Sequence, residues 1–242
     1  MNKLALLRYI IREAIADLKK PKIIFLAGGP GSGKSTVVNA LDLTDFETVD
    51  PDKPYEEYLI QNNIPLDIAK IENDYFEVKE RMEAAVEAGN QEEVARLTPE
   101  YTEKRRLISV KGKGFIASQQ AMKKRHQEIA GEKRNFIIDG TGGDFGVIAR
   151  LKLGLEKEGY DTAMIFVAAP LEVALQRNQA RGETGGRRLR DETVEKSWMA
   201  AHNNLKRFEK LFGDTLFYVD AKDLEGSMAR IKPMVNRFKS NT

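Results

Sequence analysis

A glycine-rich octapeptide, Gly28 to Ser35, constrains the fold of this 242-residue chain more than any other feature. Its sequence GGPGSGKS fits the pattern G-x-x-x-x-G-K-[ST], in which backbone N–H groups turn inward around phosphate groups. The apolar run Pro21 to Ala27 precedes it and has the composition of a buried parallel strand, while Thr36 to Leu41 favours a helix. A strand, a glycine loop and a helix in this order predict a P-loop.

The side chains of this loop predict that it binds ATP together with Mg²⁺. Lys34 would neutralise the β and γ phosphates, the Ser35 hydroxyl would ligate Mg²⁺, and the start of the following helix would add a partial positive charge. A glycine turn without a nucleotide is the alternative, and the flanking strand and helix argue against it. The residues expected to contact the nucleotide are Gly28, Gly29, Pro30, Gly31, Ser32, Gly33, Lys34, Ser35 and Thr36.

The rest of the chain alternates short apolar segments with helical ones. The further strands are expected at Phe46 to Val49, Asn135 to Asp139, Thr162 to Ala168 and Leu216 to Val219. This alternation predicts an α/β protein with the P-loop NTPase fold, in which about five mostly parallel strands are flanked by helices. We therefore expect one domain spanning residues 1–242.

Three segments stand outside this regular alternation. Residues 55–130 are mostly polar and helical, with two helices joined at Gly89, and they predict a helical insertion. Residues 177–190 are rich in arginine and glycine and predict a lid. Residues 1–20 predict an amphipathic helix that packs on the core, since charged residues interrupt its apolar ones at helical intervals.

Composition excludes several classes of protein. The absence of cysteine rules out disulfides, thiolate metal sites and a cysteine nucleophile. No apolar run reaches the roughly 18 residues that a membrane span needs, so we expect no membrane association and a cytoplasmic protein. The net charge of +2 gives no global case for binding nucleic acid, although the stretches Lys104 to Lys113 and Lys123 to His126 are locally basic.

Acidic residues follow two of the expected strands. Asp50 and Asp52 come one βα unit after Lys34, where a carboxylate can receive the proton of an acceptor hydroxyl. Asp52 is the favoured base, Asp50 would contact the substrate, and helix capping by Asp50-Pro51-Asp52 is the structural alternative. Asp139 ends the apolar segment FIID and would hold Mg²⁺ through water, with Thr141 near the substrate.

Arginines in the expected lid form the third candidate group. Planar guanidinium groups match the charge that spreads over phosphate oxygens during phosphoryl transfer. Arg177, Arg181 and Arg187 are predicted to be catalytic and Arg188 to contact the substrate. A mobile lid would exclude water, with Gly182 and Gly185-Gly186 as hinges.

Other conspicuous side chains have a structural interpretation. The isolated histidines His126 and His202 lack metal-ligand spacing. Five aromatic residues late in the chain are expected in the core, namely Trp198, Phe208, Phe212, Phe217 and Tyr218.

With these residues in place, the chain resembles the zeta-toxin and polynucleotide-kinase-like group of P-loop kinases from Lys22 to Asp220. The matching segments are Asp50-Pro51-Asp52 with Pro54-Tyr55, Ile138-Asp139-Gly140-Thr141, Lys157-Glu158-Gly159-Tyr160, Arg177-Asn178-Gln179-Ala180-Arg181 and Gly185-Gly186-Arg187. The resemblance implies that Asp52 is the catalytic aspartate. Zeta-type toxins phosphorylate a hydroxyl of UDP-N-acetylglucosamine, and polynucleotide kinases a 5′ hydroxyl of DNA or RNA.

The expected function is therefore an ATP- and Mg²⁺-dependent kinase that acts on a hydroxyl of a nucleotide-like acceptor. A kinase of polynucleotides or of hydroxymethyl-base DNA is the alternative within this class. From another class, a regulatory ATPase could bind a protein through the insertion, although a guanine-reading N-K-x-D motif is absent. If the protein is a toxin, a small inhibitory protein would be a further partner.

Overall fold

The computed structural model describes residues 20–240, so the helix expected at residues 1–20 lies almost entirely outside the described residues. The elements in chain order are β1 (Lys22–Ala27), α2 (Lys34–Ala40), β2 (Glu47–Val49), α3 (Asp52–Gln61), α4 (Ile68–Glu87), α5 (Gln91–Gly131), β3 (Phe136–Asp139), α6 (Phe145–Lys157), β4 (Asp161–Ala168), α7 (Leu171–Glu183), α8 (Asp191–Phe212), the 3₁₀ turn Gly213–Thr215, β5 (Leu216–Asp220) and α9 (Leu224–Ser240). Within this range, no helix has the length and hydropathy that a bilayer-spanning segment requires.

The five strands form one sheet in the order β2-β3-β1-β4-β5, and every pairing is parallel. β1 lies at the centre, where both of its faces are covered, and all six of its residues are buried. Parallel strands need helical crossovers, which cover both faces of the sheet. The α/β fold with a parallel sheet expected from the sequence is confirmed.

Alternate residues of the strands build two cores, one on each face of the sheet. On one face Phe25 and Phe166 pack with α8 residues that include Phe208. On the other face Leu26 and Ile165 meet α2 and α9. Because side chains alternate across a strand, each neighbour in β1 belongs to the opposite core, and both cores are fixed by one strand.

The end of the chain differs from the sequence-based expectations in two ways. α9 has no counterpart among the expected elements, although its apolar residues recur at helical spacing, with Ile231, Val235 and Phe238 buried against the sheet. Tyr218, expected in the core, lies on the edge strand β5 with 38% of its surface exposed. It stacks on Phe166, with ring centroids 6.3 Å apart.

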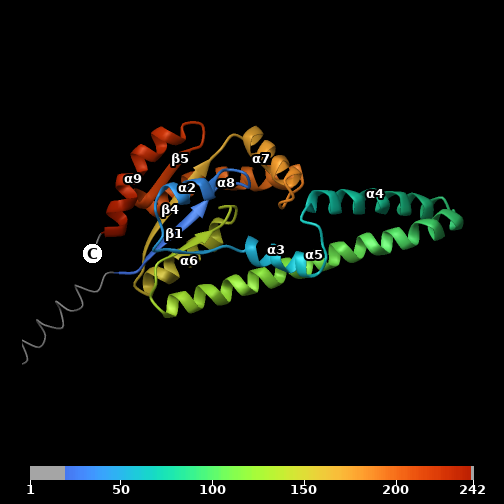
Figure 1. The fold of residues 1–242 in the computed structure, drawn as a ribbon, viewed down its shortest axis with the longest axis horizontal. Helices are drawn as coiled ribbons and strands as arrows, with labels where there is room; N and C mark the ends of the chain where they lie inside the picture. Colours follow the sequence, from blue (N-terminus) through green and yellow to red (C-terminus); the bar gives the residue numbers. More distant parts are fainter. Residues whose placement is uncertain (1–19, 241–242) are drawn as a thin grey trace, which may run out of the picture.

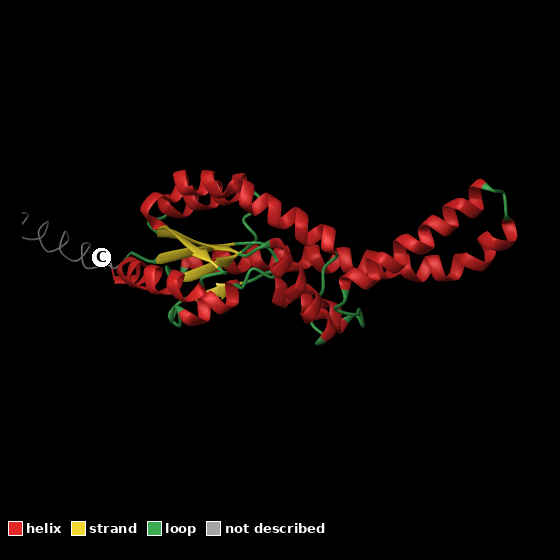
Figure 2. Cartoon of the chain, turned by 90° about the horizontal axis from the view of Figure 1, so that it is seen from above, coloured by secondary structure: helices red, strands yellow, loops and turns green. Residues whose placement is uncertain are grey.

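The helical insertion forms an arm that projects from the sheet (Figures 1 and 2). α4 and α5 run side by side and turn at Gly89, as the sequence predicted. The Asn90 side chain caps α5 by accepting a hydrogen bond from Glu93 N at 3.1 Å. At the base of the arm, α3 packs on α5 around a separate small core of Tyr55, Leu59, Ile64, Ile68 and Ile71.

Where α5 reaches the sheet, the half-buried His126 packs against Phe136, with ring centroids 5.7 Å apart. The Nε2 atom of His126 is buried without a hydrogen-bond partner among the described residues. Burial lowers the pKa of His126 to about 4, because the charged imidazolium would lose its hydration.

We predict that this histidine makes the protein sensitive to mild acid. Its folded pKa lies below the unfolded value near 6.5, so between pH 6.5 and 4 the unfolded chain binds more protons and stability falls as pH falls. At pH 5 the loss is on the order of 2 kcal/mol. Urea unfolding at pH 7 and pH 5 should show a smaller pH-dependent loss for His126→Gln than for the wild type. Equal losses in the two proteins would contradict the assignment.

Candidate active site

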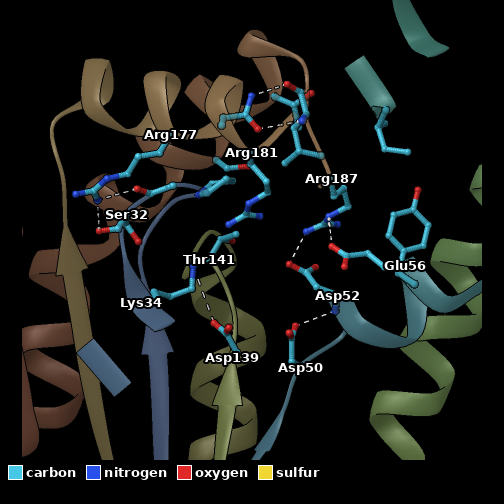
Figure 3. A pocket seen from close by; sticks show the side chains of 18 of the residues that line it. Ser32, Lys34, Asp50, Asp52, Glu56, Asp139, Thr141, Arg177, Arg181 and Arg187 are labelled. Atoms are coloured by element: carbon cyan, nitrogen blue, oxygen red, sulfur yellow. Dashed lines mark hydrogen bonds and ion pairs between the residues drawn. The ribbon is translucent and has the colours of Figure 1, made fainter. Parts of the chain in front are cut away.

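One cavity of about 900 Å³ lies at the carboxyl ends of the strands. The P-loop after β1 and Asp139 at the end of β3 face this cavity (Figure 3). β1 and β3 are neighbours in the sheet, although β2 and the insertion separate them in sequence. From β1 the chain builds β2 and β3 on one side of this strand and then crosses to build β4 and β5 on the other side. Ligands of open parallel sheets bind at such a switch point.

The backbone of the P-loop has conformations and contacts that only glycine allows. Gly28 has φ 142° and Gly31 has φ 76°. A Cβ atom on Gly28 would lie 2.4 Å from the carbonyl oxygen of Val167, and one on Gly31 would lie 2.4 Å from that of Ala174. α2 begins at Lys34, two residues earlier than expected, so the helix starts inside the loop.

Seven of the nine residues expected to contact the nucleotide, Pro30 to Thr36, line the cavity. The other two anchor the loop. Gly28 N donates a hydrogen bond to Thr141 O at 3.0 Å, and Gly29 packs beneath Trp198, whose Cα would be 3.2 Å from a Cβ at Gly29. Trp198, expected in the core, is half-buried and donates from its indole to Ala169 O at 2.7 Å. Trp198 therefore supports the loop through its contact with Gly29.

Lys34 and Asp139 come together at the floor of the cavity. Lys34 Nζ donates to Gly28 O at 3.0 Å and lies 4.0 Å from Asp139 Oδ1. Burial raises the pKa of Asp139 to about 6, opposed by the charge of Lys34 and reinforced by Asp50 and Asp52. Within the described part of the chain, Asp139 Oδ1 and Ser32 Oγ are buried without a hydrogen-bond partner.

These features fit a bound triphosphate and its metal ion. Unpaired buried polar atoms are costly and usually indicate a missing partner. The loop's open backbone, Lys34 and Ser35 suit phosphate oxygens, and Asp139 suits the water shell of Mg²⁺. The described residues contain no group of three or more His, Cys, Asp or Glu side chains that could hold a metal alone. Any Mg²⁺ here would accordingly take further ligands from phosphate oxygens and water.

The two aspartates after β2 have different roles in the structure. Asp50 Oδ1 accepts a hydrogen bond from Asp52 N at 2.8 Å and so caps the start of α3. Burial raises the pKa of Asp50. The Asp52 side chain is 45% exposed and turns toward the cavity, where it forms an ion pair with Arg187 (Figure 3). The capping alternative thus applies to Asp50, whereas the Asp52 carboxylate faces the cavity and is paired there with Arg187.

Arg187 connects the expected lid to α3. Besides Asp52 it approaches Glu56, with Nε 3.5 Å from Oε1, and its guanidinium lies 5.6 Å from the Tyr55 ring centroid. Glu56 and Tyr55 were not among the predicted site residues. The sequence held a signal for Glu56, since Asp52 and Glu56 are four residues apart and share one face of the helix.

The other arginines separate into different positions. Arg181 lines the cavity, as expected for a group that meets phosphate. Arg177 also borders it, but its Nη1 donates to the carbonyl oxygens of Gly31 at 3.1 Å and Ser32 at 3.2 Å, so it holds the P-loop backbone (Figure 3). Arg188, predicted to contact substrate, does not line the cavity, and its backbone pairs with the segment before α4.

The segment expected to be a mobile lid is tied down at several points. Arg188 N donates to Leu66 O at 3.2 Å, and Ala69 N donates to Arg188 O at 3.1 Å. The buried side-chain amide of Asn178 pairs with Leu189 in both directions, at 2.7 and 3.0 Å. The expected hinge Gly182 lies inside α7, where a Cβ would meet the Arg188 side chain at 2.8 Å.

The insertion supplies one whole wall of the cavity. Glu72 from α4 and Lys111 from α5 form an ion pair there, and Gly112 and Phe115 follow on the same helix. None of these four was among the predicted site residues. Their contribution depends on how α3, α4 and α5 pack, which no local pattern encodes.

We predict that Asn178 controls how tightly the segment 186–190 is held. Asn178→Ala removes two hydrogen bonds to Leu189, each worth about 1 kcal/mol. Trypsin should then cleave after Arg187, Arg188 or Arg190 several times faster than in the wild type, because the peptide bonds after these arginines become accessible to the protease. Gln179→Ala, at the exposed neighbouring position of α7, is the control and should leave the cleavage rate unchanged. Unchanged cleavage in Asn178→Ala would show that other contacts hold the segment.

Solved structures with related folds are found, whereas a search of curated protein sequences gives no match. A candidate kinase from Chloroflexus aurantiacus superposes with a TM-score of 0.52 at 14% identity, covering 90% of this chain and 98% of that one. The PezAT toxin–antitoxin structure from Streptococcus pneumoniae gives 0.48 at 15% identity, covering 91% and 77%. The Pnkp1/Rnl/Hen1 RNA repair complex gives 0.48 at 17% identity, covering 80% of this chain and 48% of that one.

The likeness to the Chloroflexus protein supports a common fold, in agreement with the parallel sheet and P-loop described above. A family model described as an AAA domain matches residues 23–208, which is well over half of the chain and includes the P-loop, Asp52, Asp139 and the arginines of α7. The protein therefore belongs to this AAA-domain family, with a fold of the P-loop kinase type.

Proposed function

We propose that the protein is an ATP- and Mg²⁺-dependent kinase that transfers the γ-phosphoryl group to a hydroxyl of a nucleotide-like acceptor. One observation carries the proposal. A single cavity brings the P-loop together with Asp139 on one side and the Asp52 carboxylate on the other. A carboxylate that faces the phosphate site can accept the proton of an acceptor hydroxyl, which is the role that a kinase requires of its base.

Each group has a role in the transfer. Lys34 neutralises the β and γ phosphates, Ser35 and Asp139 hold Mg²⁺, and the metal ion supplies charge neutralisation at the phosphate oxygens. The acceptor oxygen bonds to the γ phosphorus while the bond from that phosphorus to the bridging oxygen breaks, which releases ADP. Asp52 accepts the hydroxyl proton.

The arginines divide between chemistry and positioning. Arg181 and Arg187 face the cavity and would stabilise the charge on the transferred group. Arg187 pairs with Asp52 and Glu56 before substrates bind, so it lies beside the proposed base. Arg177 holds the carbonyl oxygens of the P-loop and so keeps the loop's N–H groups directed toward the phosphates.

The acceptor half of the cavity supports a nucleotide-like small molecule such as a UDP-sugar. Tyr55 and Phe115 give it an aromatic wall, with ring centroids 6.2 Å apart. Aromatic faces suit nucleobases, and the polar groups around them suit a sugar.

A polynucleotide acceptor has weaker support. The basic stretches that favoured it are largely engaged within the protein. Lys104 pairs with Asp74 at 2.7 Å, Lys111 pairs with Glu72, and Arg125 pairs with Glu47 at 2.6 Å. Cations already paired with carboxylates contribute less to binding a phosphate backbone.

We predict that Asp52→Asn lowers phosphoryl transfer by about 10²- to 10⁴-fold and leaves ATP binding intact, because only proton acceptance is lost. Asp50→Asn keeps an oxygen that can cap α3, so it should retain most of the activity. The measurement is transfer of γ-labelled phosphate to UDP-sugars, nucleosides and oligonucleotides, with thermal unfolding as a check on folding. Equal rates for Asp52→Asn and wild type would remove Asp52 from the mechanism, and label released only as inorganic phosphate would indicate an ATPase.

A further inference from the structure

The stretch Lys111 to Phe115 (KGKGF) places two glycines in the middle of α5, a continuous helix from Gln91 to Gly131. A glycine inside a helix costs about 1 kcal/mol relative to alanine, because it fixes a more flexible backbone. Two of them within three residues weaken the helix that supports the whole arm.

Packing explains Gly114. A Cβ at this position would lie 2.5 Å from Tyr58 Cδ1 and 3.3 Å from Tyr55 Cε2. Gly114 is buried, and its missing side chain lets α3 lie close against α5. A larger residue here would push the two helices apart.

Packing does not explain Gly112. Outside its own stretch of helix, no described atom lies within 4 Å of a Cβ built at this position. Nevertheless Gly112 lines the cavity, so the space in front of it is cavity space. An alanine would fit there and strengthen the helix. The open volume at Gly112 is thus maintained at a cost to the stability of α5.

The neighbours of Gly112 indicate what fills this volume. Phe115 lies three residues later and so on the same helix face, and 55% of its surface is exposed. Its ring meets that of the buried Tyr55 edge to face, at an interplanar angle of 89°. The charge of Lys111 is neutralised by its ion pair with Glu72. This wall therefore presents the exposed ring of Phe115 and the backbone of Gly112 to the cavity.

We propose that Gly112 leaves room for a flat ring of the acceptor, which lies against α5 with Phe115 beside it. The inference rests on the proposed function, since it assigns part of the same cavity to the acceptor. On this proposal, the insertion selects the acceptor by recognising a flat ring in it, such as a nucleobase. Without a side chain at position 112, the ring can approach the helix backbone closely.

The test compares Gly112→Ala and Gly112→Leu with a matched control, Gly154→Leu. Gly154 also lies in a helix and does not line the cavity, and a Cβ placed on it would have no described atom within 4 Å outside its own turns. The acceptors are uridine, adenosine, UDP-N-acetylglucosamine and short DNA and RNA oligonucleotides, all with flat rings, and glucose, gluconate and glycerol, which have none. The readouts are KM for acceptor and for ATP, kcat, and Tm.

We expect transfer to a ring-bearing acceptor, with Gly112→Leu raising its KM by about tenfold or more while KM for ATP changes less than about twofold. Gly112→Ala should have a smaller effect. Leucine and alanine are better helix formers than glycine, so all three variants should keep or raise Tm, which separates blocked binding from misfolding.

Other results overturn the proposal. Transfer only to acceptors without a flat ring would refute it and leave the kinase assignment standing. A ring-bearing acceptor whose KM is the same in wild type, Gly112→Leu and Gly154→Leu would also refute it. Absence of transfer to every acceptor, with ATP bound, would reject the proposed function and this inference with it.

Discussion

The parallel pairing of β1 with β3 and β4 is the constraint on which the rest of the structure depends. In this register Leu26 lies beside Asp139 on one side and beside Ile165 on the other. Parallel strands end at the same edge of a sheet, so this pairing places the P-loop next to the Asp139 carboxylate, although the two are far apart in the sequence. The six buried residues of β1 therefore fix both the core and the position of the phosphate site.

A second set of interactions builds the acceptor side on this frame. Arg187 in segment 186–190 forms an ion pair with Asp52 on α3. The backbone of the same segment pairs with the residues around the start of α4. Buried polar groups need partners, and here Asn178 satisfies both backbone groups of Leu189. The cavity is consequently enclosed by three parts of the chain that are far apart in sequence but joined by hydrogen bonds and ion pairs.

Sequence reasoning reached the fold and the phosphate side of the cavity because both have local signatures. Apolar runs mark the strands to within one or two residues, and the glycine loop identifies itself by its pattern. The roles of the remaining candidates depend on tertiary contacts. Nothing local distinguishes Arg177, which holds the P-loop, from Arg181, which lines the cavity, because both are arginines four residues apart on α7.

Asp52 and Arg187 were predicted, but the wall that the insertion adds to the acceptor side was not, for a related reason. Which residues of a long helix face a cavity depends on the angle at which its neighbours pack, and α3 packs on α5 at Gly114 in a manner that only the assembled structure shows. α9, by contrast, had a readable pattern of apolar spacing. α9 could therefore have been predicted from the spacing of its apolar residues. The wall formed by Lys111, Gly112 and Phe115 could not, because it depends on how distant helices pack.

The backbone bridge between Asp67 and Arg188 joins the rim of the cavity to the root of the arm. α4 alone has 20 residues, which at 1.5 Å per residue gives a length of about 30 Å. If the arm pivots as a rigid rod, a rotation of about 10° at its root displaces its tip by about 5 Å. The arm is then a lever, and small adjustments around the bound substrates become large displacements at a point far from the chemistry.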